Sequence, residues 1–407
     1  MIVGKVVGSV VSTRKSDKLI GQKFMIVEPV HHMKADLSQI VAIDIIGAGI
    51  GEYVLVAQGS AARIGCGEET APIDAAIVGI IDDGAGLEDS GVVGAGGAGF
   101  PTYAKLTDKA DTILMNCAEC EPLLKLHRQL LEKHAYEIMK TFHMVMETVG
   151  ASQAIIGIKK SYVQTIKALQ QHIEEFPGLK IHLLDEVYPM GDEVVLIYEA
   201  TGRVCRPGGL PIEQGVIVFN VETIYNVYQA VTSQNPVTEK YVSVVAEVGH
   251  PVTVKVPLGC TLDEVVAQAG EITTKDPVYF VGGPMMGRIG NGSDPVTKTT
   301  NAVLVLPRDH QIVMKKQRTS AIDLKRAASI CCQCNTCTDL CPRHNLGHPI
   351  DPARFMRAAS AGDFRDLNPY IDSAFCSSCG VCEMYACPQS LAPRSLLADM
   401  KGGLRKA

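Results

Sequence analysis

The amino-terminal part of the chain consists of short apolar runs separated by glycine and polar turns. Runs of this kind, with little helical periodicity between them, are typical of short β-strands. The expected strands are Lys5–Val11, Phe24–Val27, Ile40–Ile46, Tyr53–Val56 and Ala75–Ile81. Five short strands in so short a stretch predict a small closed β-barrel of the OB type.

The pattern changes at residues 82–86, Asp-Asp-Gly-Ala-Gly, which predict a break between domains. From Leu123 to about Ile173, apolar residues recur at helical spacing among helix-forming residues. Strand-like runs interrupt or follow this stretch at Ala154–Ile158, Ile181–Leu184 and Gly215–Phe219. Alternating strands and helices predict an α/β domain over 87–235.

Between Tyr241 and Leu306 the pattern predicts strands around a single helix, Leu262–Ala269, as in a small β-grasp-like module. The carboxyl-terminal part is helical in pattern and carries most of the cysteines. We therefore expect a multidomain α+β protein with four parts. Their expected bounds are 1–83 for the barrel, 87–235 for the α/β domain, 236–308 for the β-grasp module and 320–400 for the helical domain.

Composition narrows the class of protein. The chain has 407 residues, of which 46% are hydrophobic and 20% charged, so a disordered chain is excluded. The net charge of -6 gives no support for binding nucleic acid or an anionic membrane. No apolar run reaches the ~18 residues of a membrane-spanning helix, and the first residues lack the features of a signal peptide. We expect a cytoplasmic protein without membrane insertion.

The cysteines follow two spacings that are typical of iron–sulfur proteins. Each group has three cysteines at i, i+3 and i+6, and a further cysteine before a proline. Three thiolates at this spacing can bind three irons of one cluster, while the fourth cysteine of each group binds the other cluster. The expected ligands are Cys331, Cys334, Cys337 and Cys387 for one 4Fe-4S cluster, and Cys341, Cys376, Cys379 and Cys382 for the second. A zinc ribbon or plain buried thiols are the alternatives, but zinc sites do not need the cysteine at i+6. Cys332 fits neither spacing.

A glycine-rich loop, Gly94–Gly99, precedes Pro101, which can open a helix through residues 102–105. Several glycines before a helix N-terminus allow backbone N–H groups to converge on a phosphate. A flexible linker is the alternative, and a Rossmann crevice is not supported because only Val92 and Val93 precede the loop. Downstream, Cys117-x-x-Cys120 has the spacing of a redox dithiol, although no thioredoxin-like βαβ pattern surrounds it.

Residues 91–106, GVVGAGGAGFPTYAKL, resemble the flavin-phosphate loop shared by the flavin subunit of respiratory complex I and the RnfC family. Three further segments, 116–122, 188–193 and 220–223, resemble flavin-contacting segments of that family. The run GGPMMG at 282–287 resembles a turn of the soluble-ligand-binding β-grasp domain. With the paired cysteine motifs, the chain from 90 to 400 is similar to the cobalamin reductases of propanediol-utilisation microcompartments.

This resemblance implies an FMN site. By position, the FMN phosphate is expected on the loop glycines Gly94, Gly96, Gly97 and Gly99, with Lys105. The isoalloxazine is expected near Asn116, Glu119 and Glu121, in a pocket closed by Asn220 and Thr223. A lysine can neutralise a phosphate, and amide and carboxylate groups can hydrogen-bond to the ring and ribityl atoms. Glu193 is the candidate for the nicotinamide site, so Glu119, Glu121 and Glu193 are the expected catalytic residues.

The amino-terminal barrel, residues 1–83, resembles the EutN/CcmL family, the pentameric vertex proteins of bacterial microcompartments. The matching segments are 1–30, 51–63 and 72–82. The resemblance implies a homopentamer and microcompartment shell proteins as partners. An oligonucleotide-binding barrel is the alternative, but up to Asp82 the chain offers only Phe24 and Tyr53 for stacking on bases.

The function that these parts predict is electron transfer from NADH through FMN and two 4Fe-4S clusters to an acceptor, which we expect to be the cobalt of a corrinoid. A corrinoid enzyme or an adenosyltransferase would then be the partner, within a cytoplasmic microcompartment. One alternative is a shell-vertex electron relay without NADH reductase activity. Another is an RnfC-like subunit of a membrane complex, which has no need of a vertex barrel. The chain ends at Ala407, sooner after Cys387 than many such reductases, so a truncated or engineered chain is a further alternative.

Overall fold

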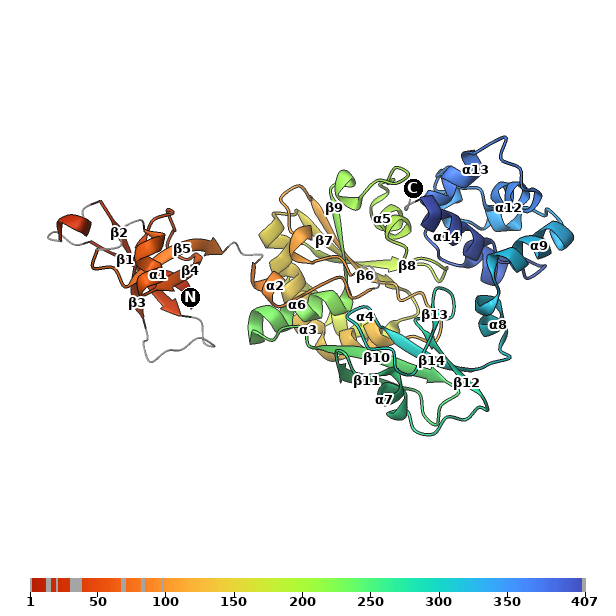
Figure 1. Ribbon diagram of the computed structural model, residues 1–407, viewed down its shortest axis with the longest axis horizontal. Coiled ribbons are helices and arrows are strands. Elements are labelled where there is room, and N and C mark those ends of the chain that lie inside the picture. Colours follow the sequence, from red (N-terminus) through yellow and green to blue (C-terminus); the bar gives the residue numbers. More distant parts are fainter. Residues whose placement is uncertain are drawn as a thin grey trace. The chain divides into compact units, whose positions relative to one another are not determined.

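The computed structural model describes residues 2–11, 16–19, 21–29, 39–66, 71–81, 85–96 and 99–404. The chain forms two compact units, Met1–Asp89 and Ser90–Ala407, which Figure 1 shows with their helices and strands labelled. Its architecture is multidomain α+β, as the sequence predicts.

The first unit is a closed five-stranded barrel with the strand order β1-β2-β3-β5-β4. Its strands are β1 (Ile2–Val10), β2 (Lys23–Pro29), β3 (Ile40–Asp44), β4 (Tyr53–Gln58) and β5 (Ala75–Ile81). β3 and β5 pair in parallel, and the other neighbours are antiparallel. Alternate apolar side chains, among them Val6, Val27 and Val54, are fully buried inside it. The predicted small closed barrel is confirmed.

Three short helical segments in this unit escape the sequence pattern: η1 (Asp17–Leu19), α1 (Ser60–Gly65) and α2 (Ala85–Asp89). Ala85 and Gly86 of the expected break between domains begin α2, where Leu87 is buried, and the two compact units divide just after it, between Asp89 and Ser90. A helix of one turn has too few residues to show a periodicity, so the sequence pattern does not reveal it. Whether such a turn forms depends on the packing of a single apolar side chain. The remaining residues of the expected break, 82–84, lie outside the described residues.

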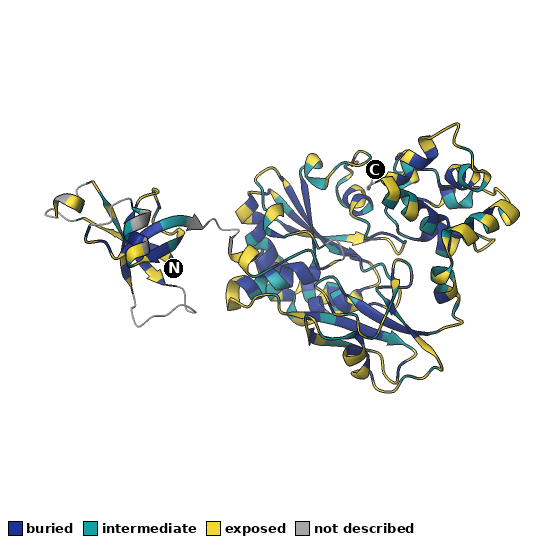
Figure 2. Ribbon diagram, in the orientation of Figure 1, coloured by how far each residue is buried: buried dark blue, intermediate teal, exposed yellow. Residues whose placement is uncertain are grey.

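The second unit begins with a four-stranded sheet in the order β8-β7-β6-β9, in which all neighbours are parallel. Its strands are β6 (Thr112–Cys117), β7 (Gln153–Lys159), β8 (Leu179–Leu184) and β9 (Val216–Asn220). The helices around it are α3 (Leu126–Val149), α4 (Val163–Gln170), α5 (Glu193–Thr201) and α6 (Val221–Ser233). Helices cover both faces, so the strands are buried, as Figure 2 shows. The predicted α/β pattern is confirmed, although β6 was not anticipated.

A second sheet follows, in the order β11-β10-β14-β12-β13. Its strands are β10 (Glu239–Ala246), β11 (Val252–Pro257), β12 (Pro277–Val281), β13 (Arg288–Gly290) and β14 (Ala302–Pro307). The central strands β10 and β14 are parallel, and the others pair antiparallel. Helix α7 (Leu262–Ala267) begins at a Thr261–Glu264 capping box and packs its apolar side chains on the sheet. Strands around one helix are what the sequence predicts.

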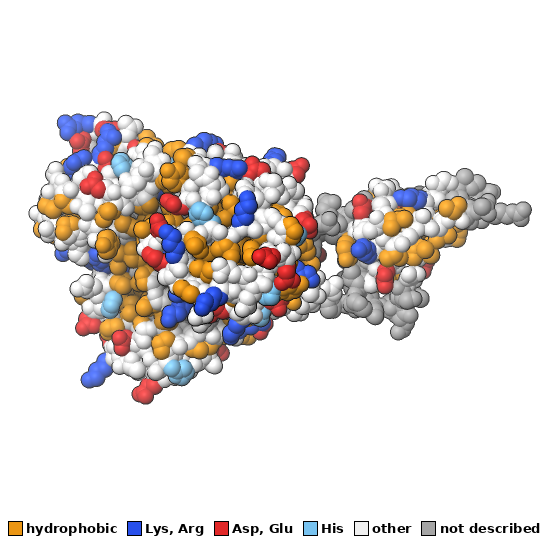
Figure 3. Space-filling model, turned by 180° about the vertical axis from the view of Figure 1, so that it is seen from behind, with side chains coloured by type: hydrophobic (Ala, Val, Ile, Leu, Met, Phe, Trp, Pro, Cys, Tyr) orange, Lys and Arg blue, Asp and Glu red, His pale blue; other side chains and the backbone are white. Residues whose placement is uncertain are grey.

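The rest of the chain is helical. Its α-helices are α8 (Gln311–Gln317), α9 (Ser320–Ile330), α10 (Thr336–Asp339), α11 (Pro342–Asn345), α12 (Pro352–Ala361), α13 (Asn368–Ile371) and α14 (Pro393–Leu404), with η6 (Asp372–Phe375) and η7 (Cys382–Ala386) between them. Phe355, Tyr370 and Leu397 form the centre of their core. No helix in the described residues is long and apolar enough to cross a membrane. Acidic and basic side chains are interspersed over the face of the second unit shown in Figure 3.

Candidate flavin cleft and cysteine cavities

The glycine-rich loop is closed by backbone hydrogen bonds. Gly94 N–H donates to the Phe100 carbonyl at 2.8 Å, and Gly99 N–H donates to the Gly94 carbonyl at 3.2 Å. Pro101 pairs with Val93 in an isolated β-bridge. The helix expected after Pro101 is only a 3-10 turn, η3 (Tyr103–Lys105), because the chain turns away at Leu106, which is extended.

A cleft of about 670 Å³ lies between this loop and the carboxyl ends of β6 and β9. Ligands of parallel α/β sheets bind at these ends of the strands. Asn116 and Asn220 occupy the last paired positions of the two strands and are direct neighbours in the sheet. The cleft is lined by Gly94, Gly96, Phe100, Thr102, Lys105, Asn116, Gly191, Glu193, Val218, Phe219, Asn220 and Thr223.

Most residues expected around a flavin therefore meet in one place. Gly99 helps to close the loop but does not line the cleft. Gly97 lies outside the described residues. Glu119 and Glu121 line the neighbouring cleft instead.

A Cβ atom at position 96 would overlap the side-chain amide of Asn220, so any residue other than glycine would displace Asn220. The neighbouring residue of the loop contacts α6, because Ala95 N–H donates to Thr223 Oγ1 at 3.0 Å. The loop is thus held against the amino-terminal end of α6, an end that carries partial positive charge. This close approach places Gly96 at the cleft wall beside Asn220.

Lys105 supplies a positive charge inside the cleft. Its Nζ donates to the Val218 carbonyl at 2.8 Å and lies 5.9 Å from the Phe219 ring centroid. Burial lowers the pKa of Lys105, and the negative charge of Glu193 partly offsets this. One of its three donors is used, so two can still reach an anionic ligand.

Glu193 begins α5 on the other side of the cleft and is exposed to water. The protein atoms crowded around it raise the pKa of its carboxyl group, while Lys105 lowers it. Because water still reaches the side chain, we expect the rise to be small. The carboxylate of Glu193 and the ammonium group of Lys105 face each other across the first cleft.

Thr102 was not anticipated as a site residue. Its hydroxyl oxygen is buried at the cleft and has no hydrogen-bond partner. A buried polar atom without a partner is costly and usually marks the place of a ligand or water. The cleft therefore fits a polar cofactor.

A second cleft of about 920 Å³ adjoins the first, because Gly96, Asn116, Gly191 and Asn220 line both. Three buried polar atoms in its wall have no hydrogen-bond partner: Glu119 Oε2, His127 Nδ1 and Asn301 Oδ1. Glu119 Oε2 is 3.8 Å from Arg128 Nε. These atoms leave both donors and acceptors for a polar ligand.

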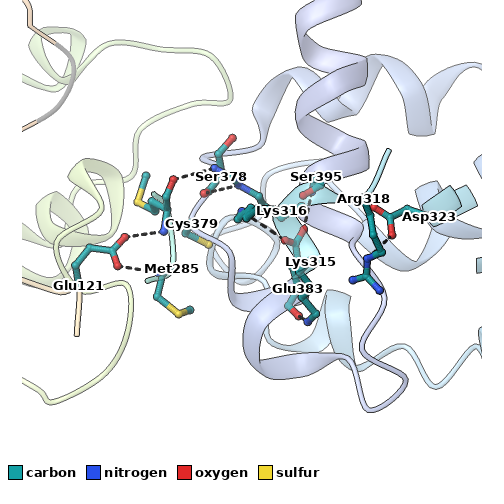
Figure 4. Close-up of polar contacts among 12 residues, drawn as sticks. Glu121, Met285, Lys315, Lys316, Arg318, Asp323, Ser378, Cys379, Glu383 and Ser395 are labelled. Atoms are coloured by element: carbon teal, nitrogen blue, oxygen red, sulfur yellow. Dashed lines mark hydrogen bonds and ion pairs between the residues drawn. The ribbon is translucent and has the colours of Figure 1, made fainter. Parts of the chain in front are cut away.

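The carboxylate of Glu121 is already occupied by backbone contacts. It accepts hydrogen bonds from Met285 N–H at 2.9 Å and Met286 N–H at 2.8 Å, as Figure 4 shows for Met285. Burial raises the pKa of Glu121, and these two bonds oppose the rise. In this structure Glu121 holds the turn at 282–287 beside the cleft.

The thiols of Cys117 and Cys120 form no disulfide. Burial raises the pKa of both thiols. Cys120 Sγ is engaged with backbone groups, donating to the Ala118 carbonyl at 2.9 Å and accepting from Gly191 N–H at 2.8 Å. Protonated, buried thiols are poor nucleophiles, which disfavours the redox-dithiol interpretation.

The eight motif cysteines surround two cavities. The first has about 440 Å³ of empty space, part of it open to solvent, and its cysteines are Cys331, Cys334, Cys337 and Cys387, with Cys332 beside them. The second has about 320 Å³ of empty space, also partly open, and its cysteines are Cys341, Cys376, Cys379 and Cys382. The structure thus brings together the same two sets that the spacing predicts.

The cavities differ in exposure. Cys332 and Cys334 of the first are exposed, whereas Cys341, Cys376 and Cys382 of the second are buried. Burial raises the pKa of Cys337 to about 12 and that of Cys341 to about 11. Grouped thiols of this kind ionise readily only when they bind a metal, so both cavities fit a metal centre.

No group of three His, Cys, Asp or Glu side chains among residues placed by the structure is arranged to hold a single metal ion. In a 4Fe-4S cluster each thiolate binds its own iron, so the sulfur atoms lie around a larger volume. Hydrogen bonds reach several of the sulfurs, including Ser378 N–H to Cys376 Sγ at 3.3 Å and Thr336 Oγ1 to Cys334 Sγ at 3.2 Å.

Three contacts that sequence analysis missed join the clefts to the second cavity. Tyr188 donates its hydroxyl to the Cys379 carbonyl at 2.6 Å. Arg343 forms an ion pair at 2.9 Å with Asp192, the N-cap residue of α5. A Cβ atom at Gly380 would lie 2.8 Å from the Met285 carbonyl oxygen, so glycine permits the close approach of the two loops. Tyr188 lies in one of the segments singled out by resemblance, but its partner could not be foreseen.

Family models match three parts of the chain. Residues 1–82 match the family described as ethanolamine utilisation protein EutN/carboxysome. Residues 87–229 match the Nuo51 FMN-binding domain, and residues 330–392 match the 4Fe-4S dicluster domain. Fold and matches together define a flavin and iron–sulfur oxidoreductase that carries a microcompartment-type barrel.

Similarity to whole proteins is more specific. A cobalamin reductase PduS of Citrobacter freundii is 42% identical over 317 residues, which are 78% of this chain and 70% of that protein. One component of the Na(+)-translocating ferredoxin:NAD(+) oxidoreductase complex of Acetobacterium woodii is 30% identical over 262 residues, 63% of this chain and 56% of that component. The chain belongs to the PduS cobalamin reductase family.

The fold has a counterpart among solved structures. An NAD+-reducing NiFe-hydrogenase in the air-oxidised state superimposes with a TM-score of 0.54 at 21% identity. The alignment covers 78% of this chain and 62% of the hydrogenase chain. This likeness concerns the fold alone.

Proposed function

We propose that this protein passes electrons from NADH through FMN and two 4Fe-4S clusters to the cobalt of a corrinoid. The observation that carries the proposal is that Cys379 lines both the second cleft and the second cysteine cavity. A cofactor in the clefts and a cluster in that cavity would therefore be neighbours. Membership of the PduS family supports the corrinoid as acceptor.

FMN, when bound, supplies the exchange between two-electron and one-electron transfer that a hydride donor and iron–sulfur clusters require. In the proposal, the backbone of Gly96 and the charge of Lys105 bind its phosphate, on a loop that Gly94 closes through its hydrogen bond to Phe100. Thr102 offers a further hydroxyl, and Asn116 and Asn220 orient the ring from the ends of β6 and β9. Gly99 and Thr223 shape the loop.

The second cleft is the proposed entry for NADH. Glu119, whose Oε2 has no hydrogen-bond partner, would orient the nicotinamide from this cleft and Glu193 from the adjoining first cleft, while Glu121 keeps the wall of the second cleft in place. Cys341, Cys376, Cys379 and Cys382 would bind the nearer cluster, and Cys331, Cys334, Cys337 and Cys387 the more exposed one, from which electrons leave.

The barrel gives the proposal its location. We assign 1–83 to a EutN/CcmL-type vertex domain that forms a homopentamer and binds shell proteins of a cytoplasmic microcompartment. The further domains in the proposal are 87–235 for FMN, 236–308 as a β-grasp domain of the soluble-ligand-binding class and 320–400 for the clusters. A corrinoid enzyme or an adenosyltransferase would take up the electrons.

The test is anaerobic purification with quantitation of FMN, iron and sulfide, followed by reduction with NADH. We expect about eight irons and about one flavin per chain, both bleached by NADH. Gly96→Ala should lose the flavin and keep the iron, because the new Cβ overlaps Asn220. Gly402→Ala, in α14 with open space around it, is the matched control. Full clusters with a flavin that NADH leaves oxidised would instead describe a shell-vertex electron relay.

A further inference from the structure

Arg394 stands in the first turn of α14 and lines the second cysteine cavity. The side chain is half-buried. Its Nε donates to the Ser378 carbonyl and its Nη2 to the Met286 carbonyl, each at 3.3 Å. It therefore lies between the cysteine cavity and the turn that Glu121 holds.

The cavity wall contains a second arginine, Arg343, and the two differ in how their charge is compensated. Arg343 is ion-paired with Asp192 at 2.9 Å. In the part of the chain that the structure describes, no carboxylate lies within ion-pair distance of Arg394, and both of its hydrogen bonds end on carbonyl oxygens. Its field reaches Glu121 through space, where it lowers the pKa of a carboxylate already bonded to two N–H groups.

Arg394 is also connected to a cysteine sulfur through one residue. Ser378, whose carbonyl accepts from Arg394, donates its own N–H to Cys376 Sγ at 3.3 Å. The guanidinium thus fixes the loop that carries Cys376 and Cys379 while its charge faces the cavity. Figure 4 shows Ser378 and Cys379 beside Met285, on the side toward Glu121.

We propose that Arg394 raises the reduction potential of the cluster held by Cys341, Cys376, Cys379 and Cys382. The inference rests on the cofactors assigned under the proposed function. Reduction adds one electron to a cluster whose thiolate ligands are already negative, with no bond formed or broken. A positive charge on the wall stabilises this added charge, and partial burial limits its screening by water. Arg394 acts on the cluster electrostatically and is a positioning residue, since no reacting atom need touch it.

The consequence concerns the direction of electron flow. The second cluster adjoins the clefts, so it is the first acceptor after the flavin in the proposed path. A higher potential there favours the transfer of electrons out of the flavin cleft. In the first cavity the lining arginine, Arg357, is exposed to water, which screens its charge more strongly.

The test is a redox titration of the full-length holoprotein followed by electron paramagnetic resonance. Cys379→Ser identifies the signal of the second cluster. We expect Arg394→Gln to lower the equilibrium constant for reduction of that cluster tenfold or more. For a one-electron step this is a drop of about 59 mV in the midpoint potential. Arg394→Lys, which keeps the charge, should stay closer to the parent. Arg357→Gln, the matched control, should shift the first cluster by less.

An unchanged potential in Arg394→Gln would overturn the proposal, and so would equal shifts in the Gln and Lys variants. Loss of iron from Arg394→Gln would also overturn it, since the residue would then be needed to hold the cavity together. Failure of the proposed function can be distinguished from failure of the Arg394 proposal, because the parent protein itself would then lack two 4Fe-4S signals.

Discussion

The buried ion pair between Lys240 and Glu222 offers the sharpest test of the packing between the two sheets of the second unit. Glu222 lies in the first turn of α6 and Lys240 on β10, and each side chain is only 1% exposed. Burial lowers the pKa of Lys240, and the carboxylate of Glu222 opposes this. The pair therefore joins the first α/β layer to the second sheet at a site shielded from bulk solvent.

Lys240→Met removes the cation and leaves the Glu222 carboxylate buried and uncompensated. Breaking a buried pair in this way costs about 3–5 kcal/mol, whereas replacing both partners by apolar residues is often neutral or stabilising. A loss of 3 kcal/mol reduces the ratio of folded to unfolded protein by more than about a hundredfold. The double variant Glu222→Leu/Lys240→Met should recover most of this loss.

The assay is urea unfolding of the anaerobic holoprotein, followed by flavin fluorescence, with the same transition compared in every variant. Lys255→Met is the matched control, because its pair with Glu239 joins β10 to β11 with side chains 48% and 47% exposed. Exposed pairs contribute about 0–1 kcal/mol. If Lys240→Met were no less stable than Lys255→Met, or if the double variant gained nothing over Lys240→Met, the argument from burial would be refuted.

Two further predictions concern the cofactors. Cys334→Ser should lower the iron content by one cluster and preserve the more buried cluster. Cys379→Ser should remove the more buried cluster and also slow reoxidation of the NADH-reduced flavin. Loss of both clusters from either variant would contradict two separate cavities. Because the pKa of Glu193 is raised, its carboxylate loses its charge as pH falls through that pKa, and Lys105 then loses its counter-charge. In the parent protein, the rate of flavin reduction by NADH should therefore decrease as the pH is lowered from about 8 to about 4, whereas in Glu193→Gln it should not change. Stopped-flow absorbance measures this rate, and equal pH profiles would exclude a role for the Glu193 charge.

The fold could be predicted where the signal is local in sequence. The two cysteine triplets group correctly because i, i+3 and i+6 spacing confines three thiols to one loop. β6 escaped notice, since Thr112–Cys117 is a short apolar run buried on both faces and therefore lacks the alternation of an exposed strand. The helix expected after Pro101 shortened to a single 3-10 turn because its carboxyl end is extended at Leu106.

The site could be predicted only in part, for a different reason. The family resemblance assigned Gly94, Gly96, Asn116 and Asn220 to one site, and they line one cleft because the ends of β6 and β9 meet at one edge of a parallel sheet. The contacts of Tyr188 and Arg394 depend on partners 191 and 108 residues away along the chain. No spacing marks such pairs, and a single sequence gives no other signal for them.

The side chains of Glu121, Tyr188 and Arg394 all end on backbone atoms of two short segments, the turn at 282–287 and the loop at 377–379. Such anchoring does not depend on the side chains of the two segments, although the glycines required by close approach and the proposed cluster ligand Cys379 must be kept. The segments can therefore change in sequence between relatives while the three anchoring residues keep the flavin side and the cluster side in register. Because the anchoring uses backbone atoms, a spectroscopic label can also be attached at an exposed position of the turn at 282–287. Such a label would report on the contact between the flavin side and the cluster side without weakening that contact.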